Sequence, residues 1–396
     1  MLTVGVTGTN GKTTTTTFVA AILKERSSSV VSVTTLGASL DGERLEVPAG
    51  FDGLLAAVDR CRHEGGTACA IEYTSEALSA GVARYFPADV GVFTNLTHDH
   101  LDAHGSLEHY LASKAQLFVM LKEGGAAVLN GCDENAALLA EIVPPGRRTI
   151  RYGLASRGEP WGALDLTAND VTIDWSGTTF DLVVGGLVPS ACRLHIRAIG
   201  SIFAENALAA LGAGLAANVP FDAVVARLAT CEPPPGRFER VAGANVVVDY
   251  AHSPDALART ITTARALTTK NVVVVFGAGG NRDPAKRPLL GAAASRADRI
   301  VLTSDNARDE DPAAIAAAIR RGIASGADVI VELDRARAID RAIREASEND
   351  VVVIAGKGHE SVQVESGRSR AFSDRAVATA TIVALGRTNV PRIAAR

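Results

Sequence analysis

The sequence predicts an α/β protein of two domains. The first would hold a mostly parallel sheet plus a small antiparallel sheet, and the second would be a smaller doubly wound domain. Three observations support this prediction. Short β-branched segments alternate with Ala- and Leu-rich stretches, a glycine-rich loop joins the first strand to the first helix, and three consecutive prolines divide the chain. Such alternation of strands and helices is typical of parallel sheets with crossover helices.

The expected parallel strands are short apolar segments rich in Val and Ile. In chain order they are 30–33, 68–71, 90–93, 126–129, 246–248, 272–276, 300–302, 329–331 and 351–354. Residues 163–195 differ, because short β-rich pieces such as 179–184 are separated by Ser and Gly turns. We expect these pieces to form antiparallel strands of the first domain.

The strongest break in the chain is Glu232-Pro233-Pro234-Pro235-Gly236, because proline continues neither a helix nor a sheet. We place the boundary just after it, so that the first domain is 1–238 and the second is 239–396. The glycine-rich loop begins at the fifth residue, and we therefore expect no separate domain before it.

Composition argues against several classes of protein. The net charge of −4 is spread without basic blocks, which gives no support for binding to nucleic acid. No apolar run reaches the roughly 20 residues of a membrane span, and the N-terminus lacks the pattern of a signal peptide. The five cysteines have no metal-like spacing and suit reduced thiols. We expect a cytoplasmic protein.

The most informative motif is the glycine-rich segment Gly5–Thr14, which reads GVTGTNGKTT. A strand before it and a helix after it would aim backbone N–H groups and the positive helix end at phosphate oxygens. Lys12 would neutralise β- and γ-phosphate charge, and the Thr13 hydroxyl would reach Mg²⁺. Val6 stands where the common Walker spacing has its first glycine. The predicted phosphate-binding residues are Gly8, Thr9, Asn10, Gly11, Lys12, Thr13 and Thr14.

Further polar residues follow other predicted strands. Glu72 follows strand 68–71, and segment 95–105, after strand 90–93, contains three His and two Asp within seven residues. The helix expected at 110–118 carries Lys114 among apolar neighbours, and alone it would be read as a surface lysine. Together with the phosphate loop, these groups predict metal and phosphate ligands at the carboxyl edge of the sheet.

In these motifs the chain resembles the Mur ligases, ATP-dependent carboxylate–amine ligases of cell-wall peptide synthesis. The resemblance covers essentially the whole chain, and the later motifs look like those of the family's tripeptide synthetases. The matching segments are 5–14, 94–105, 110–118, 235–237, 249–257, 277–283, 303–308 and 356–360. The resemblance implies a P-loop central domain and a Rossmann-like C-terminal domain. Typical relatives also carry an N-terminal domain that binds the UDP-sugar, and we expect this chain to lack that domain.

The resemblance also implies a set of metal ligands. Thr13 and Glu72 would hold one Mg²⁺, and His100 and Lys114 would hold a second. Lys114 would be carbamylated by CO₂, because a carbamate offers oxygen ligands whereas an ammonium would repel the metal. Lys12, Glu72, His100 and Lys114 are the residues expected to carry the chemistry.

For the rest of the nucleotide, the resemblance implies contacts from Asn206, Arg237, Asp249 and His252. Phe203 stands where the family has a first Asn of its adenine-site motif, so part of adenine recognition is altered.

The residues expected to bind the substrates lie in both domains. Those implied for the amino acid form a set that suits a zwitterionic end, since an Arg fork binds carboxylate and a carboxylate binds ammonium. They are Arg282, Asn306, Arg308, Gly356 and Glu360. Ala307 replaces the Pro of the diaminopimelate-type loop. Ser75 is expected near the acceptor, next to Glu76, where the family usually has His.

We therefore expect an ATP-dependent ligase that works through an acyl phosphate and adds a diaminopimelate-like amino acid to a non-UDP carboxylate or peptide. A partner protein that supplies acceptor recognition is an alternative to a non-UDP acceptor. Other readings are a folylpolyglutamate-synthetase-like ligase and an inactive nucleotide-binding regulatory or scaffold subunit. A P-loop GTPase or transport ATPase is disfavoured, because nothing after residue 14 resembles its switch loops.

Overall fold

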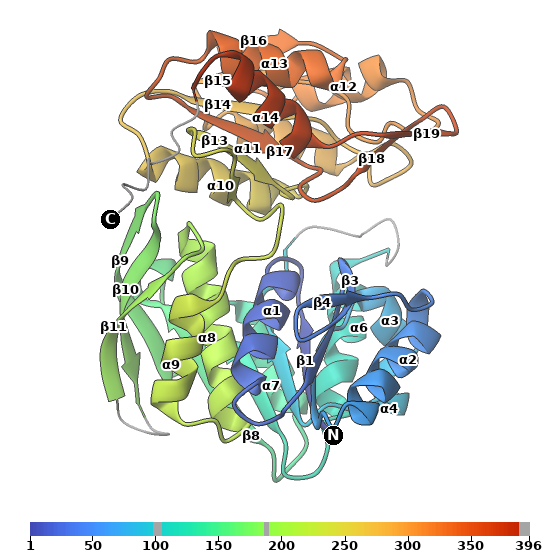
Figure 1. The fold of residues 1–396 in the computed structure, drawn as a ribbon, viewed down its shortest axis with the longest axis vertical. Helices are drawn as coiled ribbons and strands as arrows, with labels where there is room; N and C mark the ends of the chain where they lie inside the picture. The colour runs from blue at the N-terminus through green and yellow to red at the C-terminus, as the bar shows by residue number, and fades with distance from the viewer. Residues whose placement is uncertain (98–104, 186–189, 388–396) are drawn as a thin grey trace, which may run out of the picture. The chain divides into compact units, whose positions relative to one another are not determined.

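The computed structural model describes residues 1–97, 105–185 and 190–387, which fall into two compact units (Figure 1). The first unit contains the described residues up to Pro234, and the second begins at Pro235. Every segment predicted as a parallel strand forms one, and the boundaries differ by at most one residue. In the described part of the chain, no helix has both the length and the apolar character that crossing a bilayer demands.

An eleven-stranded sheet organises the first unit, in the order β11-β10-β9-β8-β7-β6-β1-β5-β2-β3-β4. Strands β2, β5, β1, β6, β7, β8 and β9 pair in parallel. The predicted antiparallel strands β9–β11 extend this same sheet, and β3 and β4 add a second antiparallel edge that the sequence analysis did not identify. The strands are β1 (Leu2–Thr7), β2 (Val30–Thr34), β3 (Gly37–Leu40), β4 (Glu43–Leu45), β5 (Ala68–Glu72), β6 (Val90–Phe93), β7 (Ala126–Asn130), β8 (Arg148–Leu154), β9 (Leu166–Asp174), β10 (Gly177–Val184) and β11 (Ser190–Ile196).

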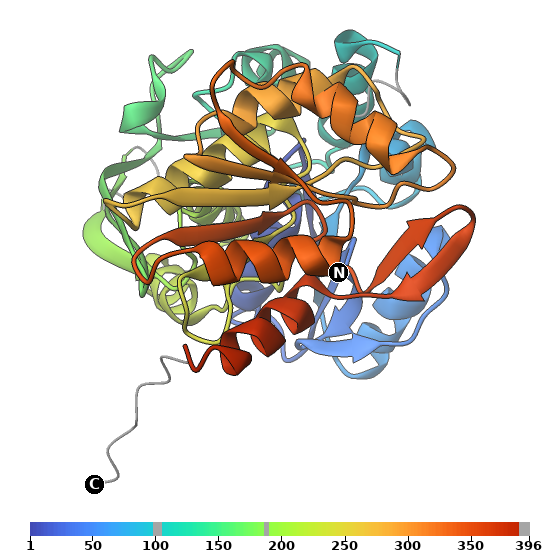
Figure 2. The same ribbon diagram turned by 90° about the horizontal axis from the view of Figure 1, so that it is seen from above.

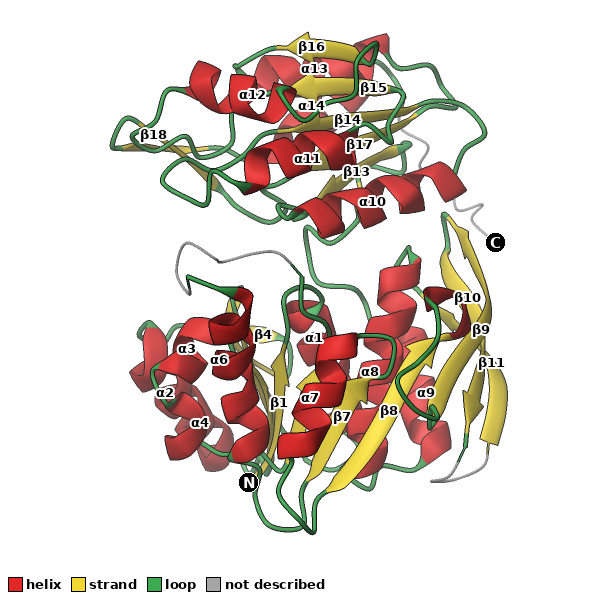
Figure 3. Ribbon diagram, turned by 180° about the vertical axis from the view of Figure 1, so that it is seen from behind, coloured by secondary structure: helices red, strands yellow, loops and turns green. Residues whose placement is uncertain are grey.

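Helices cover both faces of this sheet. Helices α1, α8 and α9 pack on one another over one face, and α2, α6 and α7 lie against the other, where Figure 3 shows α7 beside β7 and β8. The helices are α1 (Lys12–Leu23), α2 (Gly50–His63), α3 (Ser75–Ser79), α4 (Val82–Tyr85), α6 (Leu107–Val119), α7 (Glu134–Ile142), α8 (Ser201–Ala216) and α9 (Phe221–Thr230), with a 3₁₀ turn at Ala155–Arg157.

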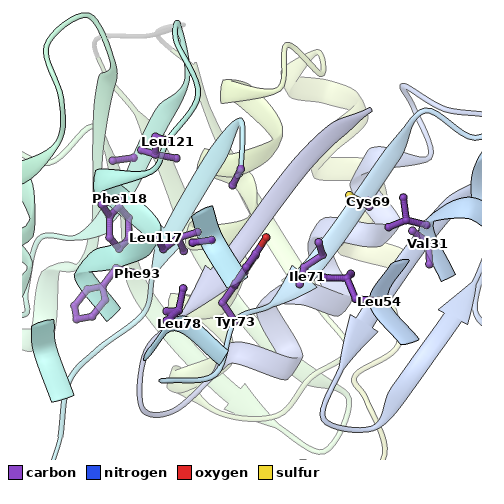
Figure 4. Close-up of a cluster of buried hydrophobic side chains, with 14 of the residues drawn as sticks. Val31, Leu54, Cys69, Ile71, Tyr73, Leu78, Phe93, Leu117, Phe118 and Leu121 are labelled. Carbon is purple, nitrogen blue, oxygen red and sulfur yellow. The ribbon is translucent and has the colours of Figure 1, made fainter. Parts of the chain in front are cut away.

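A large apolar cluster fills the space between the sheet and helices α2 and α6 (Figure 4). Tyr73, just after β5, and Leu117 of α6 lie over β1 at Gly5. A Cβ atom at Gly5 would come within 2.8 Å of the Tyr73 ring and 2.9 Å of Leu117. Gly5 is therefore required for α6 to pack close to the strand that leads into the phosphate loop.

The second unit contains a six-stranded sheet in the order β12-β13-β17-β14-β15-β16, with only β12 antiparallel. Helices α10, α11 and α12 form one layer, and α13 and α14 lie side by side against the other face (Figure 2). The strands are β12 (Glu239–Arg240), β13 (Val246–Asp249), β14 (Val272–Phe276), β15 (Arg299–Leu302), β16 (Asp328–Val331) and β17 (Val351–Ala355), and a separate hairpin is formed by β18 (Val362–Glu365) and β19 (Arg368–Ala371). The helices are α10 (Pro254–Ala266), α11 (Lys286–Ala294), α12 (Pro312–Arg320), α13 (Arg335–Glu345) and α14 (Asp374–Ala384).

Candidate functional site

The glycine-rich segment forms the predicted strand–loop–helix unit. Strand β1 ends at Thr7, residues 8–11 form the loop, and α1 begins at Lys12. Gly11 caps the helix in the left-handed conformation, with φ 86° and no side-chain capping bond. The first N–H groups of α1 therefore point into the loop, where an anion would be stabilised by these donors and by the helix dipole.

Two loop positions accept only glycine. A Cβ atom at Gly8, where φ is 145°, would lie 1.9 Å from Thr94 Oγ1. One at Gly11 would lie 2.4 Å from Asn206 Oδ1, which also places this predicted nucleotide residue directly against the loop. Real Cβ atoms do not approach other atoms this closely, so both glycines permit contacts that shape the loop.

The loop is held in place by the residues that follow β6. Asn95 accepts from Thr9 N through its carbonyl (2.8 Å) and from Asn10 N through Oδ1 (2.9 Å). In return, Asn95 Nδ2 and Thr94 Oγ1 both donate to the Asn10 carbonyl, at 3.1 and 2.6 Å. Thr97 N donates to Thr9 Oγ1 at 3.0 Å. These bonds fix the backbone around Thr9 and Asn10 before any ligand binds, which reduces the ordering cost of phosphate binding.

A buried carboxylate lies beside the start of α1. Glu72 is the last residue of β5 rather than the residue after it, and it is 8% exposed. Its Oε2 accepts from Thr13 Oγ1 (2.9 Å), from Thr35 N (3.2 Å) and from Thr35 Oγ1 (3.4 Å). Lys12 Nζ lies 3.9 Å from Glu72 Oε1 and donates to the Thr9 carbonyl at 2.9 Å. Carboxylate and hydroxyl oxygens are the donor types that Mg²⁺ prefers.

Lys114 lies inside the first unit and not on its surface. The residue is 1% exposed, and its ammonium donates to the Gly8 carbonyl at 2.8 Å. The same nitrogen lies 4.1 Å from the centroid of the Tyr110 ring, which adds a cation–π contact. Lys114 thus belongs to the underside of the phosphate loop. His100, predicted beside it, lies outside the described residues.

Around this core, the sequence analysis named four further residues. Ser75 is buried at the start of α3, where its hydroxyl donates to the exposed Glu76 carboxylate at 3.3 Å. Asn206 and Phe203 both lie in α8 and are 3% and 5% exposed. Phe203 therefore packs as an apolar residue of the first helical turn.

In the second unit, three predicted nucleotide residues surround Tyr250. The Arg237 guanidinium lies 4.6 Å from the Tyr250 ring centroid, and the His252 ring lies 4.6 Å from it. Asp249 is 8% exposed and accepts from Phe238 N (2.6 Å), Ala251 N (2.9 Å) and Thr260 Oγ1 (2.9 Å). The Asp249 carboxylate therefore joins the segment next to Arg237 to the turn that carries His252.

The residues predicted for the amino acid gather at the carboxyl ends of β14, β15 and β17. Arg308, with φ 54°, donates from NH1 to the Gly280 carbonyl at 2.7 Å. Asn306 Nδ2 donates to Glu360 Oε2 at 2.8 Å. Gly356, with φ 110°, leaves no space for a side chain, because a Cβ would lie 2.6 Å from Asp305 Oδ2. Arg282 lies on the exposed side of the loop after β14, and the structure gives it no bond to these residues.

The sequence analysis missed three groups that shape these sites. Lys357 is completely buried and donates to Asn306 Oδ1 (3.0 Å) and Glu360 Oε2 (2.7 Å), so Glu360 already has an ammonium partner within the chain. Thr35 binds Glu72. Asp133 accepts from Leu96 N at 2.7 Å, and burial raises the pKa of its carboxyl. Lys357 lies within segment 356–360, which the sequence analysis identified. Nothing in the sequence indicates that Thr35 bonds to Glu72 or that Asp133 bonds to Leu96.

The structure thus assembles two groups of predicted residues. The first unit brings together the phosphate loop, Glu72, Lys114 and Asn206, and the second brings together Asn306, Arg308, Gly356 and Glu360. Within the described ranges, no three His, Cys, Asp or Glu side chains are grouped as a metal site. A cleft of about 510 Å³ between α3, α4 and α6, bordered by Arg84 and His109, is lined by none of the predicted site residues.

Two family models match this chain. Residues 6–214 match the Mur ligase middle domain, and residues 236–358 match the Mur ligase glutamate ligase domain. The UDP-N-acetylmuramoyl-L-alanyl-D-glutamate–2,6-diaminopimelate ligase of Solibacter usitatus is 39% identical over 398 residues, covering 96% of this chain and 77% of its own. The enzyme of the same name from Xanthomonas campestris pv. campestris is also 39% identical, with the same coverage.

Solved structures have the same fold. A UDP-N-acetylmuramoyl-L-alanyl-D-glutamate–2,6-diaminopimelate ligase superposes with a TM-score of 0.66 and 32% identity, covering 98% of this chain and 79% of that one. A folylpolyglutamate synthase of Mycobacterium tuberculosis, solved with ADP and AMPPCP, gives a TM-score of 0.72 at 22% identity and covers 96% of this chain and 90% of its own. At that identity, the second likeness shows the fold alone.

Proposed function

Because the chain belongs to the Mur ligase family and is an ATP-dependent acid–amino-acid ligase, we propose that it joins a diaminopimelate-like amino acid to a carboxylate acceptor that carries no UDP. The observation that carries this proposal is the cluster of Lys12 with the buried Thr13 and Glu72 at the phosphate loop, with the buried Lys114 beneath it. In this cluster, Lys12 supplies a cation that can bind phosphate, and Thr13 and Glu72 supply oxygen atoms that can bind a metal.

The cluster suits ATP and Mg²⁺, which the family uses. Glu72 and Thr13 present a carboxylate and a hydroxyl 2.9 Å apart, and Thr35 fixes the orientation of the carboxylate. When bound, Mg²⁺ would neutralise negative charge on the transferring phosphoryl group. Lys12 adds a second positive charge, and the loop N–H groups orient the phosphates.

Lys114 and His100 would hold a second Mg²⁺ if Lys114 carries a carbamate. An ammonium donates hydrogen bonds and cannot ligate a metal, whereas a carbamate supplies two oxygen ligands. A carbamate also keeps one N–H, so the bond to the Gly8 carbonyl at 2.8 Å could persist after modification.

The proposed reaction has two steps. An oxygen of the acceptor carboxylate attacks the γ-phosphorus of ATP, so that an O–P bond forms, the bond to ADP breaks, and an acyl phosphate results. The amine of the second substrate then attacks the acyl carbon, the C–O bond to phosphate breaks, and the amine loses a proton as the amide forms. Lys12 and the phosphate loop stabilise charge in the first step.

The site in the second unit supports an amino acid with a charged distal end. Arg308 supplies a planar cation for a carboxylate. Glu360 Oε2 is shared by Lys357 and Asn306, so an ammonium of the substrate would be bound by a carboxylate whose charge is partly neutralised. On the acceptor side, the exposed Glu76 carboxylate would repel an anionic group, which supports an acceptor different from that of the named relatives.

The test is ATP-dependent phosphate release in the presence of diaminopimelate, lysine or glutamate, each combined with UDP-linked and free peptide carboxylates. We expect release that depends on diaminopimelate and on a free carboxylate. Release only with glutamate would favour the folylpolyglutamate-synthetase-like alternative, and release only with the UDP-linked peptide would refute the acceptor assignment. ATP binding without amine-dependent turnover in any combination would favour a regulatory subunit.

The carbamate has its own test. Lys114→Ala should abolish turnover, and short-chain carboxylic acids should restore part of it by replacing the missing ligand. Lys122→Ala is the matched control, because Lys122 pairs with Asp89 on the surface of the same unit at 2.8 Å. Wild-type activity in Lys114→Ala would refute the role of Lys114.

A further inference from the structure

A buried ion pair lies at the base of the two loops proposed to bind the amino acid. Arg335 and Asp374 are both completely buried, and each is the first residue of a helix, α13 and α14. Arg335 donates from Nε to Asp374 Oδ1 (2.7 Å) and from NH2 to Asp374 Oδ2 (2.8 Å). This bidentate geometry fixes the plane of the guanidinium.

The same guanidinium reaches two backbone carbonyls. NH1 donates to the Ser304 carbonyl at 3.2 Å, and NH2 donates to the Ala355 carbonyl at 2.9 Å. Ser304 lies between the end of β15 and Asn306, and Ala355 is the last residue of β17, immediately before Gly356. One side chain therefore holds the start of both loops.

The two loops are also bonded to each other beyond this point. Lys357 Nζ donates to Asn306 Oδ1 at 3.0 Å, and Asn306 Nδ2 donates to Glu360 Oε2 at 2.8 Å. Because these bonds need a definite separation between the loops, a shift at the base would change the position of Asn306 and Glu360 together.

An apolar pair would fill the same space without charge, and a buried ion pair is by itself weak evidence for stability. Burial acts to lower the pKa of the Arg335 guanidinium, but its charge interaction and hydrogen bonds with Asp374, together with the charges of Asp305 and Glu360, raise that pKa overall. What apolar residues could not supply is the set of directed N–H donors that fixes two carbonyls at once.

We propose that Arg335, oriented by Asp374, is a positioning residue that sets the spacing of loops 304–308 and 355–360 and thereby the affinity for the amino acid. This inference rests on the proposed function, in which Asn306, Arg308 and Glu360 bind that substrate. Arg335 itself touches no substrate.

The test compares Arg335→Lys with Ile339→Ala. Lysine keeps the positive charge but cannot donate hydrogen bonds to Asp374 and to both backbone carbonyls in one plane. The control, Ile339→Ala, removes a fully buried side chain of the same helix and changes no residue of the two loops. In hydrogen exchange, Arg335→Lys should speed exchange in peptides covering 304–308 and 355–360 at least tenfold relative to Ile339→Ala. In turnover, it should raise the KM for the amino acid at least tenfold and leave the KM for ATP within twofold.

Unchanged exchange in both loops would overturn the inference, and it would do so even if no substrate is found. Faster exchange with an unchanged KM for the amino acid would also overturn it. A wild type that turns over no amine refutes the proposed function separately, because exchange still reports the spacing of the loops. If Arg335→Lys does not fold, Asp374→Asn removes the bidentate partner and leaves Arg335 in place, with the same expected results.

Discussion

Gly11 offers a direct test of the phosphate loop, because the chain contains a matched control. Gly11 and Gly81 each cap the N-terminus of a helix in the left-handed conformation, with φ of 86° and 81° and no side-chain capping bond. Alanine at either position therefore pays a similar backbone cost of about 1–2 kcal/mol. The surroundings differ, since a Cβ at Gly81 would meet nothing within 4 Å and one at Gly11 would lie 2.4 Å from Asn206 Oδ1.

The extra cost at Gly11 can be estimated from this contact. Asn206 is 3% exposed, so its amide has no solvent into which it can turn. Either Asn206 leaves its preferred rotamer, at about 0.5–1.5 kcal/mol, or the loop moves away from α8. Both changes alter the donors offered to phosphate, and a loss of about 1.4 kcal/mol in ATP binding corresponds to a tenfold weaker Kd.

The assay is titration calorimetry with ATP and Mg²⁺, combined with denaturant unfolding. Both variants should lower the free energy of unfolding, and Gly11→Ala should lower it by about 0.5–1.5 kcal/mol more than Gly81→Ala because of the contact with Asn206. Only Gly11→Ala should weaken ATP binding tenfold or more. The reasoning fails if Gly11→Ala binds ATP as tightly as the wild type, or if both variants lose affinity equally.

Three other predictions address the metal, the amino acid and a buried thiol. Thr13→Val should lower turnover at limiting Mg²⁺ and recover at higher Mg²⁺, whereas Thr17→Val, which removes only a bond to the Thr13 carbonyl, should have little effect in the same titration. Arg308→Ala should weaken binding of the amino acid by roughly 2–5 kcal/mol and leave the KM for ATP unchanged. Arg320→Ala, at an exposed arginine, should change neither the binding of the amino acid nor the KM for ATP. Burial raises the pKa of Cys69 from 9.0 to about 11. The thiol ionises at a lower pH in the unfolded chain than in the folded protein, so the free energy of unfolding falls as the pH rises from about 9 to about 11. This fall should be ~2–3 kcal/mol smaller in Cys69→Ala than in the wild type.

The sequence predicted the strands well because their signal is local. Runs such as Val272–Phe276 are apolar throughout, as expected for strands buried on both faces. The β3–β4 pair and the β18–β19 hairpin escaped prediction, because each strand has only three or four residues and none is a continuous apolar run. β4 and β19 are mostly polar and exposed, and β3 buries only Ala38 and Leu40. Their pairing depends on neighbours and not on an apolar pattern.

The candidate site was predictable where residues are close in sequence or belong to a motif. The phosphate loop is one continuous segment. No comparable motif marks Thr35, whose bonds to Glu72 join residues 37 positions apart in the chain. The burial of Lys114 could not be deduced from the sequence either. Apolar sequence neighbours are compatible with a lysine whose ammonium reaches the surface and also with one whose ammonium is buried.

The order of the strands explains why the first-unit residues meet. In the sheet, β1 lies between β6 and β5. Asn95 follows the end of β6, and Glu72 is the last residue of β5. The parallel register pairs Val6 with Glu72 and Thr7 with Phe93, so all three strands end at the same level. The loop after β1 therefore lies between the Glu72 carboxylate and Asn95. At about 3.3 Å per residue, a shift of β5 by two residues would move Glu72 by about 7 Å, beyond the reach of Thr13. The register of β5 against β1 therefore determines whether a carboxylate and a hydroxyl can meet at the start of α1.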